Sequence, residues 1–378
     1  MKKNMIIGYL TDSNPEDKRA WSGTIYHIYR AIKNTGVTVI HIPVKERPIV
    51  WCYRKVLKFV IKRLLHKHIR PYYTTRIAYF LSSSIDRKLL DSVDAIFVPR
   101  CATSMYSLPT NKPVIYYTDT TFKIMVGYYF YNLYNWNIKQ GNLVEQTALN
   151  KSRYAIASSE WAANSMIHDY DISKDKVKII EFGANIDDKD ISLRERRKKD
   201  IFHILFLGVD WNRKRGDTAC ETCIELNKLG IKTILHIVGV RSIPKKYNNN
   251  PYIDLIGFLN KNLSDDYANL IRIIENSDIL LLPTKAECSA IVFAEASAFG
   301  LPCFTCDTGG TANYVRNGIN GYRLPVDSSG KDFAYKIKEA IENDEMKKLS
   351  AGGIRLYKEV LNWSVVSEKL KELFEEID

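Results

Sequence analysis

The chain has 378 residues, of which 46% are hydrophobic and 26% are charged, the composition of a globular protein. This length is too great for one ordinary hydrophobic core, so we expect two domains. No run of about 18 apolar residues occurs, so no transmembrane helix is expected. Seven cysteines, an odd number in a large chain, favour a reducing cytoplasm over a disulfide scaffold.

The net charge of +12 is concentrated in one stretch of the N-terminal half. Residues 1–190 carry a net charge of +11, and residues 191–378 carry +1. Within the first half, residues 47–85 hold nine Lys or Arg and no acidic residue. A local basic patch of this kind indicates an anionic partner. Because no nucleic-acid-binding module accompanies it, we do not expect that partner to be nucleic acid.

Along the first half, short β-rich runs alternate with longer amphipathic runs. The opening MKKNMIIGYL has too short an apolar run for a signal peptide and is interpreted as a first strand. The expected strands are 5–10, 37–42, 94–99, 113–118, 154–158 and 177–180, and the expected helices lie near 24–35, 75–90, 138–151 and 160–170. This alternation predicts a parallel sheet with helices on both faces.

A polar, charge-dense segment, residues 183–200, is interpreted as the inter-domain linker. A second series of strands and helices follows it. Its expected strands are 202–208, 233–239, 253–257, 278–283 and 302–306, and its expected helices lie near 214–229, 264–276, 290–299, 311–317 and 329–342. The tail, residues 363–377, has the pattern of an amphipathic helix with Ser364 as its N-cap.

These patterns predict an α/β protein with two doubly wound, Rossmann-like domains and a cleft between them. We assign residues 1–190 to the first domain and 191–360 to the second. Residues 361–378 are expected to form a helix that packs back towards the first domain. Ligands of open α/β sheets bind at the carboxyl ends of the strands, so functional residues are expected there.

Residues 286–302, AECSAIVFAEASAFGLP, place two glutamates in an otherwise small and apolar segment after a buried strand. Glu287 lies in the strand-end loop, and Glu295 lies further along the following helix. The helix start near Ser289 and Ala290 offers the N–H groups of a helix N-terminus and small side chains, which suit an anion or a sugar. The alternative for Glu295 is a solvated helix face.

Cations follow the first strand of the second domain, in VDWNRKRG. Arg213, Lys214 and Arg215 stand at a strand end beside a helix start, a pattern that favours a diphosphate clamp. The alternative is an exposed basic turn. Gly23, at the helix entry after the first strand of the chain, permits close approach of the backbone to an anion. Gly310 occupies a similar position after a later strand.

These motifs resemble the retaining nucleotide-sugar glycosyltransferases with the GT-B fold, family 4 (glycosyltransferase group 1). The resemblance rests on AECSAIVFAEA, GLP, TGGT, NGINGY and GVDWNRKRGD in residues 205–325, and more weakly on WSGT and FGANID in the first half. It implies the following roles: Glu287 holds hydroxyls of the donor sugar, Glu295 holds the nucleotide ribose, Arg213 and Lys214 neutralise the diphosphate, Gly23 approaches the phosphates, and backbone amides over Ala290, Ile291 and Val292 complete the donor pocket.

The sequence departs from the family pattern at several positions. Where family members often have a histidine near the sugar, YYTDTTF gives Asp119, which can bind sugar hydroxyls but cannot carry positive charge. The glutamate usual after the second glycine motif is Asn313. A small residue often follows the clamp lysine, and here Arg215 follows it. These departures bear on the identity of the donor more than on the reaction.

The resemblance implies a hexosyltransferase that needs no cofactor beyond its nucleotide-diphosphate sugar. The acceptor would be a glycan or a lipid-linked group, and the expected role is in bacterial surface polysaccharide or glycoconjugate synthesis. The departing phosphate takes the acceptor proton, and we find no D-x-D loop of the kind that binds a metal–nucleotide in the other major transferase fold, so we expect no metal. The alternatives are a nucleotide-sugar epimerase or phosphorylase on the same fold, and a non-catalytic membrane- or glycan-binding protein.

The basic stretch predicts a cationic helix with apolar residues at helical spacing and aromatic residues at its ends. Such a helix fits the surface of an anionic membrane, so a cytoplasmic protein peripheral to the inner face of the cell membrane is expected. The alternative is a solvated helix whose apolar stripe packs on its own domain. The cations of the expected membrane patch are Arg54, Lys55, Lys58, Lys62, Arg63 and Lys67.

Two pairs of cysteines have the C-x-x-C spacing of a zinc site, Cys220 with Cys223 and Cys303 with Cys306. The first pair falls in an expected helix and the second on an expected strand, far apart in sequence. We therefore interpret all four as buried thiols and expect no zinc.

Overall fold

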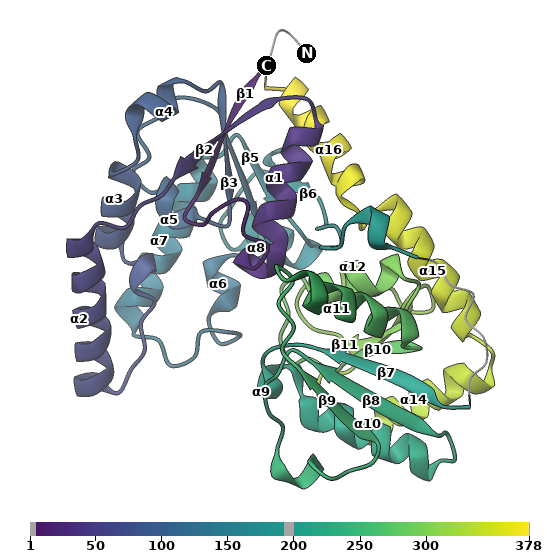
Figure 1. Cartoon of the computed structure of the whole chain (residues 1–378). Helices are drawn as coiled ribbons and strands as arrows, with labels where there is room; N and C mark the ends of the chain where they lie inside the picture. The colour runs from purple at the N-terminus through teal and green to yellow at the C-terminus, as the bar shows by residue number, and fades with distance from the viewer. Residues whose placement is uncertain (1–4, 193–199, 378) are drawn as a thin grey trace. The chain divides into compact units, whose positions relative to one another are not determined.

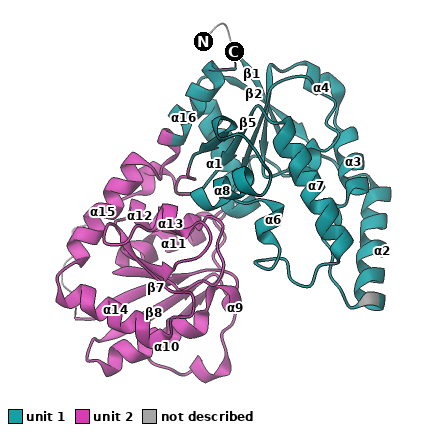
Figure 2. Ribbon diagram, turned by 180° about the vertical axis from the view of Figure 1, so that it is seen from behind, with its two compact units in different colours: residues 1–180, 366–378 teal, residues 181–365 magenta. Residues whose placement is uncertain are grey.

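The computed structural model describes residues 5–192 and 200–377, and the chain divides into two compact units (Figures 1 and 2). Unit 1 comprises Met1–Ile180 and Val366–Asp378, and unit 2 comprises Glu181–Val365. Each unit has its own parallel six-stranded sheet, so the predicted α/β class with two Rossmann-like halves is confirmed. Among the described residues, none of the helices combines the length and apolarity needed to cross a bilayer.

Unit 1 is built on six strands that pair in the order β2-β1-β3-β4-β5-β6. Each strand is a short run of apolar residues, and β3, β4 and β5 are buried along their whole length. The strands are β1 Ile6–Thr11, β2 Thr38–Pro43, β3 Ala95–Pro99, β4 Val114–Thr118, β5 Tyr154–Ala157 and β6 Val177–Ile179. The order reverses between β1 and β3, so their carboxyl ends flank the point where open α/β sheets bind ligands.

Helices on both sides complete unit 1, and its last helix, α16, comes from the end of the chain (Figures 1 and 2). The α-helices are α1 Thr24–Asn34, α2 Pro48–Leu65, α3 Thr75–Ser83, α4 Arg87–Asp91, α5 Ala102–Met105, α6 Phe122–Met125, α7 Asn135–Lys151, α8 Glu160–His168 and α16 Trp363–Glu375. Short 3-10 turns are η1 Ala20–Gly23, η2 Pro71–Tyr73 and η3 Lys174–Lys176. Phe374 of α16 packs edge-on against Phe97 of β3, which seats α16 on the core.

Unit 2 has the strand order β12-β11-β10-β7-β8-β9, with all neighbours parallel. Read from the other edge, this is the dinucleotide-binding order, and it reverses between β7 and β10. The strands are β7 Phe202–Leu207, β8 Thr233–Val238, β9 Ile253–Gly257, β10 Ile279–Leu282, β11 Cys303–Cys306 and β12 Gly321–Leu324. The loops after β7 and β10 therefore meet at the switch in strand order.

Helices cover both faces of the unit 2 sheet, with α11 and α12 on one face and α10 and α14 on the other (Figure 1). They are α9 Trp211–Lys214, α10 Gly216–Lys228, α11 Ser264–Asn276, α12 Ile291–Ala298, α13 Thr311–Tyr314, α14 Gly330–Glu342 and α15 Met346–Glu359, with 3-10 turns η4 Asp188–Asp190 and η5 Lys245–Tyr247. Cys220, Cys223, Cys303 and Cys306 lie in the core as free thiols.

Two expectations from the sequence need correction. The first part of the expected linker is not a free connection, because the apolar side chains of Ala184 and Ile186 are buried in the unit 2 core. Residues 193–199 of that segment lie outside the described residues. Ser364 is not the cap of α16. Asn362 takes that role, since its Oδ1 accepts a hydrogen bond from the Val365 N–H at 2.9 Å.

Candidate active site

In unit 2, the loop after β7 is folded by its own side chains. Asp210 caps the single turn α9, because its carboxylate accepts the Arg213 N–H at 3.0 Å. Arg215 then takes a left-handed φ of 55°, and α10 starts at Gly216. A Cβ at Gly216 would lie 2.3 Å from the Trp211 ring, so only glycine fits there. Because of this left-handed turn, the side chains of Lys214 and Arg215 point in different directions.

Arg215 does not belong to the clamp that the sequence suggested for all three cations. Its guanidinium donates to the Val326 carbonyl at 2.6 Å and to the Ser328 carbonyl at 2.7 Å. These bonds tie the loop after β7 to the segment that follows β12. The left-handed turn at Arg215 gives this side chain a structural role.

Arg213 and Lys214 both reach Glu287, in the loop after β10. The Arg213 guanidinium donates to Glu287 Oε2 at 3.1 Å and to the Ala286 carbonyl at 2.9 Å. The Lys214 ammonium contacts the same carboxylate oxygen. The backbone also joins the two loops, since the Lys285 N–H donates to the Arg213 carbonyl at 2.9 Å. Two cations and one carboxylate thus meet at the switch in strand order.

Lys214 is buried, with 7% of the residue exposed. Burial lowers the pKa of Lys214 from its usual range, and the Glu287 carboxylate opposes that effect. The lysine stem lies over Gly208, where a Cβ would approach its Cγ to 3.0 Å. A charged group held in this way is preorganised and already desolvated, so a bound anion would feel its full field.

The segment after Glu287 supplies small groups and backbone donors. Ser289 and Ala290 are buried, and α12 begins one residue later, at Ile291, with Val292 half-buried in its first turn. A further loop approaches from β11, where the Gly310 N–H donates to the Glu287 carbonyl at 3.0 Å. The first turn of α12 and Gly310 therefore lie beside the clamp.

Glu295 is buried within α12, with 3% of the residue exposed, so it is not part of a solvated helix face. Its partner is Lys261, from the loop after β9, whose ammonium contacts Glu295 Oε1. Lys261 also lies 3.5 Å from the Asn185 carbonyl. Sequence reasoning missed Lys261, because its position in FLNKN gives no sign of a partner 34 residues away.

Gly23 and Asp119 belong to unit 1. Gly23 precedes α1 with a φ of 92°, and Trp21 and Ser22 before it also have positive φ values of 51° and 58°. Three successive left-handed residues are costly for Trp and Ser, and such strain concentrates at functional sites. Asp119 follows β4 and lines a cavity of about 610 Å³.

That cavity lies at the carboxyl edge of the unit 1 sheet and combines carboxylates with aromatic rings. Asp12 follows β1 and pairs with Arg100, which follows β3, at 3.2 Å. Glu145 of α7 accepts the Tyr116 hydroxyl at 3.0 Å, and burial raises the pKa of Glu145 to about 7. The other lining groups include Trp21, Glu46, Tyr72, Tyr73, Thr121 and Phe130.

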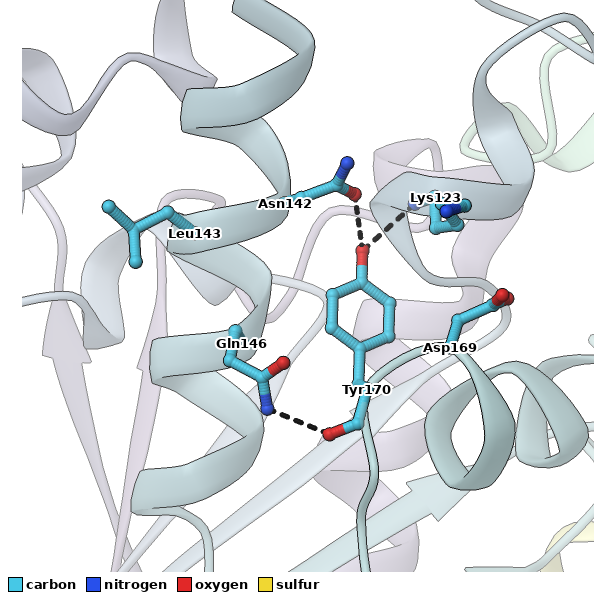
Figure 3. A pocket seen from close by; sticks show the side chains of 6 residues that line it. All are labelled: Lys123, Asn142, Leu143, Gln146, Asp169 and Tyr170. Carbon is cyan, nitrogen blue, oxygen red and sulfur yellow. Dashed lines mark hydrogen bonds between the residues drawn. The ribbon is translucent and has the colours of Figure 1, made fainter.

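A smaller cavity of about 340 Å³ lies elsewhere in unit 1, between α7 and the segment after α8 (Figure 3). The Tyr170 hydroxyl accepts the Lys123 N–H at 3.0 Å and donates to Asn142 at 2.8 Å. Gln146 donates to the Tyr170 carbonyl at 2.8 Å. These bonds fasten α7 to its neighbours, and the cavity lacks the paired cations found in unit 2.

Comparison with known proteins identifies the family of a domain in the second half of the chain. Residues 187–352 match the model of the family described as Glycosyl transferases group 1. This part of the chain is a group 1 glycosyltransferase domain. It contains the clamp, Glu295 and Gly310, so the resemblance inferred from the sequence is confirmed at the level of the family.

The group 1 domain has a curated relative, D-inositol 3-phosphate glycosyltransferase of Corynebacterium aurimucosum. It is 22% identical over 253 residues, which are 61% of this chain and 59% of the relative. The match therefore covers less than two thirds of that protein.

Two solved structures share the fold of the whole chain. Sucrose-phosphate synthase from Thermosynechococcus elongatus has a TM-score of 0.68 at 14% identity, with 99% of each chain covered. Anabaena Alr3699/HepE, in complex with UDP and glucose, has a TM-score of 0.63 at 13% identity, covering 99% of this chain and 100% of its own. At such identities the likeness establishes the GT-B fold alone.

Proposed function

We propose that this protein is a retaining hexosyltransferase that moves a sugar from a nucleotide-diphosphate sugar to a hydroxyl group. The convergence of Arg213 and Lys214 on Glu287, at the strand-order switch of the group 1 domain, carries this proposal. The charge there is cationic and preorganised, as a departing pyrophosphate requires. The sugar and UDP bound to Anabaena Alr3699/HepE support the same class of donor.

The proposed mechanism starts from the unliganded pairing of Glu287 with its two cations. A donor pyrophosphate takes over Arg213 and Lys214 and leaves the Glu287 carboxylate to accept hydrogen bonds from sugar hydroxyls. The bond between the anomeric carbon and the diphosphate breaks as the acceptor oxygen bonds to the same face of that carbon. The acceptor proton passes to the departing phosphate, so no protein base is needed. We therefore propose metal-independent transfer with no cofactor.

The same proposal assigns roles to the other residues that would bind the nucleotide sugar. Glu295 accepts hydrogen bonds from the ribose hydroxyls, and its buried position fits a neutral, hydroxyl-bearing group. The backbone around Ser289, Ala290, Ile291 and Val292 receives the sugar and phosphate oxygens, with Gly310 beside it. In unit 1, Gly23 keeps its proposed role at the phosphates.

The 610 Å³ cavity of unit 1 supports a hydroxyl-rich acceptor. Its lining carries the carboxylates of Asp12, Glu46 and Asp119 against a single lining cation, Arg100, so the cavity disfavours an anionic group; Glu145, with a pKa of about 7, is partly protonated at neutral pH. Aromatic faces and carboxylates together are suited to sugar rings. We propose that Asp119 binds hydroxyls of a glycan or lipid-linked acceptor, in the synthesis of bacterial surface polysaccharide or glycoconjugates at the inner face of the cell membrane.

The test is a screen of purified protein against nucleotide sugars, read first as thermal stabilisation. The donor that stabilises the protein is then incubated with and without excess chelator. We expect slow hydrolysis of that donor in both conditions and its loss in Glu287→Ala. Hydrolysis that requires added metal would contradict metal independence. Stabilisation without any turnover would favour a binding protein, and release of an altered nucleotide sugar without acceptor would favour an epimerase.

A further inference from the structure

Most of the apolar side chains of α2 point away from unit 1, and glycosyl transfer does not account for them. Among the described side chains of this 18-residue helix, one narrow stripe faces inward. Val50 and Ile61 are buried, and Arg54 and Leu57 are half-buried between them. Steps of four, three and four residues put these four side chains on one line along the helix.

A second stripe of α2 is apolar and exposed. Its members again follow steps of four and three residues: Ile49, Tyr53, Val56, Val60 and Leu64. The exposed fractions are 74% for Ile49, 61% for Val56 and 70% for Leu64. Phe59, 68% exposed, stands beside this stripe. An apolar surface of this extent indicates a site of interaction with a protein or a membrane.

A third stripe is cationic and runs along the other side of the helix. Trp51, Lys55, Lys58 and Lys62 repeat at steps of four, three and four, and all are exposed. The Lys55 ammonium lies 5.4 Å from the centre of the Trp51 ring. No acidic residue occurs anywhere in residues 47–85, so the field of this stripe is uncompensated along the helix itself.

Arg54 is an anchor of the helix and not part of the exposed patch. Its guanidinium makes two hydrogen bonds to Glu46, at 2.8 and 3.0 Å, and lies 4.6 Å from the Tyr72 ring centre. Val50 packs with Ile77 and Leu81 of α3. The inner stripe thus holds α2 at the outer edge of unit 1, where Figures 1 and 2 show it. The side chains of the other two stripes are exposed.

We propose that α2 docks this protein on an anionic lipid surface. The apolar stripe enters the boundary between headgroups and acyl chains, while Lys55, Lys58 and Lys62 lie at the lipid phosphates. A second copy of the chain is a poorer occupant, because pairing through the apolar stripe would leave the lysines on the other side of the helix without an anionic partner. The proposal stands apart from glycosyl transfer, since binding is measured without donor or acceptor.

The test is co-sedimentation of the full chain with vesicles. One set contains phosphatidylcholine alone, and the other contains one part phosphatidylglycerol to two parts phosphatidylcholine. We expect binding to the anionic set, weak binding to the neutral set, and release as NaCl is raised to about 0.5 M, where screening is strong. Absence of binding to the anionic vesicles would overturn the proposal.

Variants separate the two outward stripes. The triple change Lys55→Gln, Lys58→Gln and Lys62→Gln should weaken binding about a hundredfold, at roughly fivefold for each cation. The pair Val56→Ser and Leu64→Ser should weaken it by roughly tenfold or more, even at low salt, because apolar insertion is lost. The matched control removes three exposed lysines of unit 2: Lys331→Gln, Lys347→Gln and Lys348→Gln.

The control triple should bind as the unchanged chain does, and melting curves should show that all variants remain folded. Equal losses in the control and in the α2 triple would contradict α2 as the docking site and point to net charge alone. Sedimentation of the chain as a dimer that Val56→Ser and Leu64→Ser convert to monomer, without vesicle binding, would assign the stripe to a second copy instead.

Discussion

The two units place polar groups at the same point of their sheets but choose opposite charges. In unit 2 the switch in strand order holds Arg213 and Lys214 around one carboxylate. In unit 1 the corresponding edge holds the carboxylates of Asp12, Glu46 and Asp119, the partly protonated Glu145 and the single lining cation Arg100. Topology therefore decides where a site forms in each unit, and the strand-end loops decide which ligand chemistry it favours.

Each unit contains a buried ionisable group, and the two groups differ in whether burial leaves them charged. Lys214 is buried against the carboxylate of Glu287, which supports its charged form. Glu145 is buried and accepts a hydrogen bond from the Tyr116 hydroxyl, and no cation among the described residues donates to it, so its pKa rises to about 7. The counter-ion decides whether a buried group keeps its charge at neutral pH.

The largest expected effect is on the rate of sugar transfer when a cation is removed from the clamp of unit 2. Lys214→Gln should lower the rate of sugar transfer by roughly a hundredfold or more, because preorganised charge at the leaving group is lost. Lys232→Gln, an exposed lysine just before β8 at the opposite edge of the same sheet, should leave the rate unchanged. Steady-state kinetics with the donor found in the screen measure both. Equal rates in Lys214→Gln and Lys232→Gln would contradict a special role for the carboxyl edge of the unit 2 sheet.

The next effect concerns the stability of unit 1 and its pH dependence. The folded protein binds a proton at Glu145 up to about pH 7, whereas the unfolded chain releases it near the ordinary pKa of 4.5 for a glutamate. The free energy of unfolding therefore falls as pH rises between these values, by about 3 kcal/mol from this group. Urea unfolding from pH 4.5 to 7.5 should show a steeper fall for the unchanged chain than for Glu145→Gln. Parallel pH profiles would mean that Glu145 does not hold its proton.

A smaller effect is expected at Asp119. Asp119→Asn should raise the acceptor KM by roughly tenfold, as expected for one hydrogen bond to a charged group, and should leave donor hydrolysis nearly unchanged. Kinetics at varied acceptor and fixed donor separate the two readouts. A parallel loss of donor hydrolysis would move Asp119 from the acceptor to the donor.

The smallest effect is a shift in the pH profile of transfer. As pH rises through the lowered pKa of Lys214, the ammonium loses its proton and the clamp loses a charge. The rate should therefore fall at a pH below about 10.4, the usual value for lysine. Lys214→Arg should move this alkaline limb upward, since arginine keeps its charge. An alkaline limb that stays in place in Lys214→Arg would belong to another group.

Much of the fold could be predicted because its strands are short apolar runs bounded by turn residues. The expected strand 278–283, for example, corresponds to β10, Ile279–Leu282. The strand β12, Gly321–Leu324, escaped prediction because it is an edge strand whose residues are largely half-buried, and its sequence has little apolar character. α15 was also missed, since a Gly-Gly pair interrupts its helical pattern.

The candidate site was predictable only in part. Glu287, Arg213 and Lys214 stand at strand ends, where the sequence gives a reason to look. Arg215 instead binds backbone carbonyls more than a hundred residues away, after a left-handed turn, and neither feature can be predicted from its neighbours in the sequence. The unit 1 cavity is assembled from many separate loops, so Asp12, Glu46 and Arg100 share no local pattern.

The most direct test of the central claim uses inorganic pyrophosphate, which needs no knowledge of the base or sugar. Calorimetric titration compares the unchanged chain with Lys214→Gln, Arg213→Gln and the control Lys232→Gln. The account predicts that the unchanged chain and the control bind pyrophosphate alike, and that each clamp variant binds roughly tenfold or more weakly, as for a lost charged hydrogen bond. Equal affinity in all four proteins would contradict the claim that Arg213 and Lys214 hold the diphosphate.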